Sequence, residues 1–169
     1  MSAQAAFRTK ILFDTNQLLQ RAKSEEEILS QTASQLMKLL NRSLIVYPEQ
    51  NGDLGSEQVF EIDGDVPCNI FSAPEERDAA NWTFANKKRS GAGTDSYPDA
   101  KGLYLALRTG GGVFGVIGID LSEKPLDAFE NSVLLSILGE GALAIENRRN
   151  ALEKEQAALQ ARNEELRAN

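Results

Sequence analysis

Side chains that commonly carry catalysis are scarce in this chain of 169 residues. It contains no histidine and a single cysteine, Cys68. The absence of histidine excludes a Ser-His-Asp or Cys-His nucleophile, a histidine-ligated zinc ion and an axial histidine for haem. It also means that the chain cannot itself carry a phosphohistidine. What is left is the chemistry of carboxylates, one thiol and non-covalent contacts.

The acidic residues and the cysteine indicate structural rather than catalytic roles. No pair of carboxylates stands in a context apolar enough to desolvate it, so we expect no enzyme here. Asp63-Gly64-Asp65 has the composition of a calcium loop, but its spacing departs from D-x-[DN]-x-[DN]-G, and we expect a turn without a metal. Cys68 is expected to be a buried thiol. A single cysteine forms no disulfide within the chain, which suits a reducing cytoplasm.

Charge and hydropathy exclude two kinds of partner. The net charge of −7 argues against a nucleic-acid surface, and the sequence shows no basic cluster to offset it. No apolar run approaches the roughly 20 residues of a membrane span, and residues 1–6 lack the basic start and apolar core of a signal peptide. We therefore expect neither nucleic acid nor direct membrane insertion by this fragment.

The elements that would position any site are organised around residues 103–121, which read LYLALRTGGGVFGVIGIDL. Residues alternate with a period of two on both sides of Gly110-Gly111-Gly112, which is typical of a β-hairpin. The second arm is apolar on both faces, so it is predicted to be a central strand covered on both sides. Since two strands alone are not stable, other segments must complete a sheet.

Helix and strand patterns surround this hairpin in a simple order. Helical spacing covers residues 11–22, and a Ser24/Glu27 capping box opens a second helix that ends at Asn41. An alternating or apolar pattern predicts short strands at 44–47, ended by Pro48, and at 58–62. Pro74 begins a helix that carries Trp82 on its inward stripe, and the loop Ser90–Ala100 follows. The order predicts an α+β fold, an antiparallel sheet with helices segregated by face.

The last helix begins at an Asp127/Glu130 box and is predicted to continue to the C-terminus. Its apolar residues recur every seven positions, at Leu138, Ile145, Leu152, Leu159 and Leu166. With polar residues at the other seam positions, this pattern predicts a weak parallel coiled coil that would serve as a dimer stalk. A solvated, fraying helix is the alternative.

The residues also resemble a known family. Trp82, the loop SGAGTDSYPDA (90–100), YLAL (104–107) and VFGVIGI (113–119) resemble the GAF domain of KdpD-type potassium sensor histidine kinases. The resemblance is strongest from about Glu75 to Arg148. It implies a GAF-like antiparallel sheet with the terminal helices on one face, the middle helix and loops on the other, and a long C-terminal signalling helix. We expect the GAF domain at 1–150 and a helical extension toward the kinase region at 151–169.

The resemblance further implies a place for a ligand, because GAF domains often hold a small molecule between the sheet and the middle helix. Seven residues would supply aromatic walls, close backbone approach and polar contacts there: Trp82, Gly91, Gly93, Thr94, Asp95, Tyr97 and Tyr104. Each also has a structural interpretation, with Trp82 as a core plug and Asp95 as a turn-forming side chain. The signature of cyclic-nucleotide GAF domains is absent and Cys68 fits no bilin-attachment pattern. We therefore expect no cyclic nucleotide, bilin or haem, and no cofactor.

Two functions follow from this resemblance. The first is a cytoplasmic signal-relay domain of a membrane-bound sensor histidine kinase that responds to potassium or osmotic stress. It would form a parallel homodimer through its terminal helices and pass conformational change to the rest of the kinase. The alternative is a small-molecule sensor with its pocket near Trp82 and Asp95. The family's ATP-binding and phosphoacceptor motifs are absent here, so this fragment is not expected to be catalytic, although its parent would be. An enzyme of the free-methionine-sulfoxide-reductase type needs more cysteines than Cys68 alone.

Overall fold

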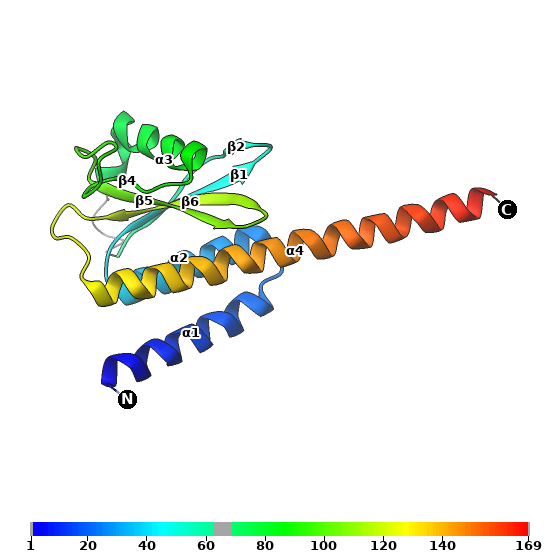
Figure 1. Ribbon diagram of the computed structural model, residues 1–169, viewed down its shortest axis with the longest axis horizontal. Helices are drawn as coiled ribbons and strands as arrows, with labels where there is room; N and C mark the ends of the chain where they lie inside the picture. Colours follow the sequence, from blue (N-terminus) through cyan, green and yellow to red (C-terminus); the bar gives the residue numbers. More distant parts are fainter. Residues whose placement is uncertain (1, 63–68, 169) are drawn as a thin grey trace.

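The computed structural model describes residues 2–62 and 69–168 (Figure 1). Cys68 and the turn predicted at Asp63-Gly64-Asp65 lie outside the described residues. The elements in chain order are α1 (Ala3–Arg21), α2 (Glu25–Leu40), β1 (Leu44–Gln50), β2 (Asp53–Leu54), β3 (Gln58–Phe60), a 3-10 turn η1 (Ile70–Ser72), α3 (Pro74–Asn86), β4 (Ser90–Gly91), β5 (Gly102–Thr109), β6 (Gly112–Asp120) and α4 (Ala128–Ala168).

The sheet is antiparallel and is centred on the predicted hairpin. Its strand order is β2-β1-β6-β5-β4, and β3 pairs with the other part of β1. Strand β6 therefore lies between β1 and β5, as its two apolar faces predict. Gly118 sits under the Tyr104 ring, where a Cβ atom would lie 2.4 Å from Tyr104 Cε1. The glycine is thus required for the ring to pack flat against the sheet.

Two layers of helices enclose the sheet. Figure 1 shows α2 and α4 beneath the sheet, α1 outside them, and α3 above it. Apolar side chains from α2, α4, β1, β5 and β6 form the larger core, and a smaller core lies between α3 and the sheet. This arrangement confirms the predicted α+β class, with the terminal helices on one face and the middle helix on the other.

Three predicted helix ends are confirmed by their hydrogen bonds. The backbone N–H of Glu27 donates to Ser24 Oγ at 3.1 Å, and Asn41 ends α2 in the left-handed conformation, with φ of 52°. At the start of α4, the N–H of Glu130 donates to Asp127 Oδ1 at 2.7 Å, and the N–H of Asp127 donates to Glu130 Oε1 at 3.1 Å. Local side-chain chemistry therefore fixes where these helices begin and end.

Two predicted boundaries in the first half of the chain are wrong. Helix α1 begins at Ala3 rather than near residue 11, because Ser2 Oγ accepts from the N–H of Ala5 at 3.1 Å and caps an earlier turn. Strand β1 continues through Pro48, which was expected to end it. The Pro48 carbonyl accepts from the N–H of Gly55 at 2.7 Å, on the side away from β6. The nitrogen of Pro48 faces that same side, so no β1–β6 hydrogen bond is lost.

Helix α4 is the one helix within residues 2–62 and 69–168 that is long and apolar enough, by length and composition, to cross a membrane. Its first half packs on the sheet, and the buried residues there are Val133, Leu134, Ile137, Leu138, Gly141, Ala142 and Ile145. We therefore describe it as a core helix. From Asn150 to Ala168 every residue is exposed, and this half projects away from the domain (Figure 1).

Candidate functional site

The face of the sheet beneath α3 is where the resemblance places a ligand. Pro74 occupies the first turn of α3, and the residues that the helix buries are mostly small: Ala79, Ala80 and Thr83. Small side chains let the helix axis come close to the sheet, which leaves little space between them. The Thr83 and Ser90 hydroxyls lie 2.7 Å apart, and Ser90 Oγ donates to the Ala79 carbonyl at 2.7 Å. These bonds fix α3 against β4.

A buried carboxylate ties α3 to β5. Glu76 is 1% exposed and accepts three hydrogen bonds. The donors are the backbone N–H of Lys101 at 2.9 Å, the N–H of Gly102 at 3.0 Å and the Tyr104 hydroxyl at 2.7 Å. Burial, followed by this bond to Glu76, raises the pKa of Tyr104 well above its ordinary value. The phenol therefore stays a neutral donor, and every contact of the carboxylate serves to hold β5 in place.

Two tyrosine rings fill the space in which a ligand would lie. Tyr104 is fully buried and Tyr47 is 1% exposed, and both belong to the core between α3 and the sheet. The Arg77 guanidinium lies 5.1 Å from the centre of the Tyr47 ring. Burial, and then the Glu57 carboxylate, raises the pKa of Tyr47 to about 12. The position is therefore occupied by the protein's own side chains.

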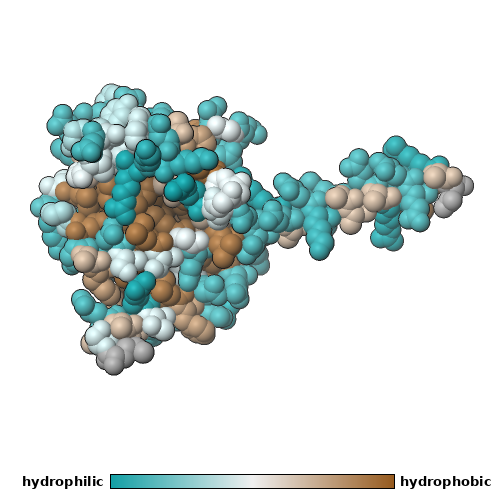
Figure 2. Space-filling view, in the orientation of Figure 1, coloured by the Kyte–Doolittle hydropathy of each residue, from teal (hydrophilic) through white to brown (hydrophobic). Residues whose placement is uncertain are grey.

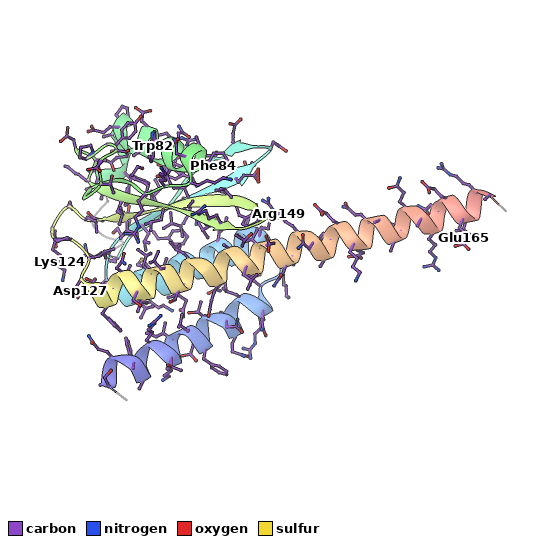
Figure 3. The ribbon with its side chains drawn as sticks, in the orientation of Figure 1. Trp82, Phe84, Lys124, Asp127, Arg149 and Glu165 are labelled. Atoms are coloured by element: carbon purple, nitrogen blue, oxygen red, sulfur yellow. The ribbon has the colours of Figure 1, made fainter. Side chains whose placement is uncertain are left out.

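The seven predicted pocket residues lie at different depths in the fold. Trp82 is only half-buried on α3 (Figure 3), so its predicted role as the core plug is wrong, and Tyr47 and Tyr104 fill that role. Tyr97 is 39% exposed, whereas Tyr104 lies in the core. Five hollows of about 250–520 Å³ in the described part of the chain are lined by residues other than these seven. The small-molecule sensor with a pocket near Trp82 and Asp95 therefore stays a prediction.

The loop from Ser90 to Ala100 is more regular than predicted. It starts as strand β4, in which Ser90 and Gly91 pair with β5. Thr94 Oγ1 lies 2.8 Å from the Gly91 carbonyl oxygen and accepts from the N–H of Ser96 at 3.3 Å. Asp95, which was expected to form this turn, is exposed. The turn depends on Thr94, and the left-handed φ values of 93° at Gly91 and 79° at Gly93 suit glycine.

A second site lies where α4 leaves the domain. Arg149 donates to both carboxylate oxygens of Glu25 at 2.9–3.2 Å and to Glu49 Oε1 at 3.0 Å. Its guanidinium also lies 5.0 Å from the centre of the Phe114 ring. The bond to Glu25 is the main reason that the pKa of Arg149 is raised. One turn earlier, Glu146 accepts a hydrogen bond from the Thr109 hydroxyl.

We call these residues (Glu25, Glu49, Phe114 and Arg149) the exit clamp, since they hold α4 at its last contact with the domain. The first turn of α2, the end of β1 and the start of β6 all meet α4 there. Figure 3 shows Arg149 at this junction and Glu165 near the far end of the helix. A displacement of any of these elements would therefore move α4 at the point where it leaves the domain.

We call the heptad residues of α4 (Leu138, Ile145, Leu152, Leu159 and Leu166) the leucine line, and this line divides at the exit clamp. Leu138 is 4% exposed and Ile145 is not exposed at all, so both belong to the domain's own core. They were predicted to be stalk contacts, and that assignment is wrong because the sheet covers them. The line continues in solvent only through Leu152, Leu159 and Leu166, which are 42%, 58% and 69% exposed. A partner helix has access to these three alone.

Comparison with known proteins shows what kind of domain this is. No family model matches the chain. Over 163 residues the chain is 30% identical to the sensor protein KdpD of Clostridium acetobutylicum. This alignment covers 96% of this chain and 18% of the KdpD sequence. The alignment thus corresponds to one segment of a much longer relative, to which this chain is homologous.

Solved structures identify the fold of that segment. The GAF domain of the potassium sensor histidine kinase KdpD from Escherichia coli superposes with a TM-score of 0.63 at 22% identity, covering 89% of this chain and 99% of that one. The chain is a GAF domain by its fold. A GAF domain of a putative sensor histidine kinase from Pseudomonas syringae pv. tomato also matches this GAF domain, with a TM-score of 0.61 at 18% identity over 91% of this chain and 94% of that one. The predicted resemblance is confirmed.

Sequence reasoning missed the residues that matter most in this GAF domain. No role in a site was predicted for Glu76, although it stands three and four residues before Ala79 and Ala80 on one face of α3. That run of small residues was a signal that Glu76 faces inward. Nothing local marks Glu25 or Glu49 as partners of Arg149, because they lie 124 and 100 residues away in sequence.

Proposed function

We propose that this GAF domain is a cytoplasmic regulatory domain of a membrane-bound sensor histidine kinase of the KdpD kind, which responds to potassium or osmotic stress. In this role it relays conformational change to the kinase region through α4. The observation that carries the proposal is the continuity of α4, a single helix of 41 residues that starts beneath the sheet and ends far outside the domain. The homology to KdpD over 96% of the chain supports the same role.

The exit clamp couples the domain to this helix. Arg149 joins α4 to α2 and β1 through charge-assisted hydrogen bonds to two carboxylates, which are stronger than neutral ones. At the other end of the buried half, Arg42 Nε lies 3.5 Å from Glu130 Oε2 in the first turn of α4. Arg42 also donates to three carbonyls of β6 and the connector before α4, those of Asp120, Lys124 and Pro125, at 2.6–3.0 Å. Helix α4 is therefore fixed at both ends of its buried half, and it moves when the domain moves.

The projecting half of α4 is proposed to pair with the same helix of a second copy. Leu152, Leu159 and Leu166 lie seven residues apart and are exposed, so a parallel partner would bury all three. Three heptad positions make a weak contact on their own. In an intact dimeric kinase the tethered helices would have a high effective concentration, and a weak contact is then sufficient. A weak contact is also one that a modest signal can shift.

Cysteine cross-linking tests this pairing. In a Cys68→Ser background, Leu159→Cys places a thiol on the leucine line, and Ala161→Cys places one two residues further on, about 160° away around the helix. We expect oxidation to yield disulfide dimers with Leu159→Cys and few with Ala161→Cys. Equal yields from both variants, or no dimer at millimolar protein, would show that this line does not pair.

A further inference from the structure

The outer edge of β5 is only partly covered. Strand β4 pairs with Leu103 and Tyr104, and no other described strand pairs with β5 on this side beyond Tyr104. The carbonyl of Gly102 accepts from the N–H of Ala92, so the backbone of Gly102 points to this edge. Because alternate residues of a strand point the same way, the N–H and carbonyl of Ala106 also face the open edge. An uncovered edge of this kind can accept another strand.

A hollow of about 250 Å³ runs along this open edge, between β5 and α4. We call it the edge groove. Its floor includes Leu105 from β5 and Leu135 from α4, the latter 48% exposed. Its polar lining comes from four cations, Lys87, Lys88, Arg89 and Arg108, and no carboxylate lines it. Figure 2 shows apolar surface between α3 and α4, interrupted by hydrophilic side chains.

This cluster is a local exception in an acidic molecule. The chain carries a net charge of −7, yet four cations meet around one groove. Three of the four, Lys87, Lys88 and Arg89, are consecutive in sequence, and the fold adds Arg108, which the loop and most of β5 separate from them. Arg89 donates to Asn131 Oδ1 at 2.9 Å, whereas Lys88 and Arg108 are exposed and make no ion pair with another described residue.

We propose that the edge groove binds an extended acidic segment of a partner protein, which adds a strand to β5. The open backbone at Ala106 would supply main-chain hydrogen bonds, the cations would pair with alternate carboxylates, and Leu135 would receive an apolar side chain between them. A second copy of this edge would bring the same four cations, so charge opposes self-pairing and favours an acidic partner. This inference is independent of stalk pairing by α4.

Peptide binding tests the proposal. The probe is a fluorescein-labelled heptapeptide of alternating Glu and Val, and its Lys–Val counterpart is the charge control. A third peptide, the Glu–Val sequence with alternate backbone nitrogens methylated on its pairing edge, keeps the charge but cannot form the strand. We expect the first peptide to bind, with affinity that falls as salt rises, and each control peptide to bind at least about tenfold more weakly.

Two protein variants locate the site. Lys88→Glu combined with Arg108→Glu should weaken binding of the Glu–Val peptide by at least about tenfold, whereas Lys154→Glu on the projecting half of α4 should leave it unchanged. Both variants change exposed residues, and circular dichroism verifies their folding. Equal binding of the methylated peptide, or tighter binding of a single-stranded oligonucleotide or of anionic vesicles, would refute strand addition. So would no binding at millimolar peptide.

Discussion

Replacing the buried carboxylate of Glu76 tests whether it holds the face beneath α3 together. Glu76→Ala removes the acceptor of three hydrogen bonds and leaves Tyr104 in place. Two of the three donors, the Tyr104 hydroxyl and the N–H of Gly102, are buried, and water cannot reach them readily. The N–H of Lys101 is only partly buried and can turn to solvent.

The expected loss follows from the buried donors. A buried donor without a partner destabilises a protein by about 1–3 kcal/mol, so two of them predict a loss of roughly 4 kcal/mol in the free energy of unfolding for Glu76→Ala. Tyr104→Phe removes one donor together with its bond and leaves Glu76 with two backbone donors. Tyr104→Phe should therefore lower the free energy of unfolding by only about 1 kcal/mol.

Urea unfolding of the two single variants and of the double variant completes the test. In the Tyr104→Phe background, Glu76→Ala no longer leaves a buried hydroxyl without a partner. The double variant should therefore lose less free energy of unfolding than the sum of the two single losses. The coupling should be about 1 kcal/mol or more, which is within the range found for contacting residues. A loss below about 1 kcal/mol for Glu76→Ala, or strictly additive losses, would show that the three hydrogen bonds do not hold the face.

Three further predictions follow from the burial of other side chains. Trp82→Ala should lower the free energy of unfolding by only about 1–2 kcal/mol, below the 3–5 kcal/mol of a buried aromatic, and iodide should quench Trp82 fluorescence in part. Arg42→Ala should cost about 2–4 kcal/mol in the same assay, because Arg42 is 6% exposed and three carbonyls lose their donor. The stability given by Tyr47 and Tyr104 should be complete below pH 10 and fall as the pH rises, through about 12 for Tyr47, because both pKa values are raised in the folded state. Absorbance at 295 nm should then show these two tyrosines ionising together with unfolding.

Local signals predicted most of the fold. The hairpin and the helix caps at Ser24, Asn41 and Asp127 each follow from residues close together in sequence. The start of α1 was missed although its cause, the cap by Ser2, is local, whereas the error at Pro48 has a non-local cause. Whether a strand continues through Pro48 depends on which side of β1 lacks a partner, and that is a property of the sheet.

The candidate site was less predictable for the same reason. Trp82 was expected in the core because it is large and lies on α3, but Tyr47 and Tyr104 from the strands occupy the space between α3 and the sheet. The stalk line was expected to begin at Leu138, since a heptad repeat does not distinguish a partner helix from the domain's own sheet. Both errors concern which apolar surface covers another, and only the packed structure decides that.

The burial of α4 restricts how the proposed relay can operate. A rotation of α4 about its axis within the domain would expose five large apolar side chains: Val133, Leu134, Ile137, Leu138 and Ile145. At about 1.5–3 kcal/mol for each fully buried side chain, that exposure would be unfavourable by about 7–15 kcal/mol. A domain of ordinary stability has only about 5–15 kcal/mol in total, so rotation in place would amount to unfolding. The exit clamp would also lose both carboxylate contacts of Arg149. The relay must therefore move α4 together with the sheet as one rigid body, and any change in helix register must begin beyond Arg149.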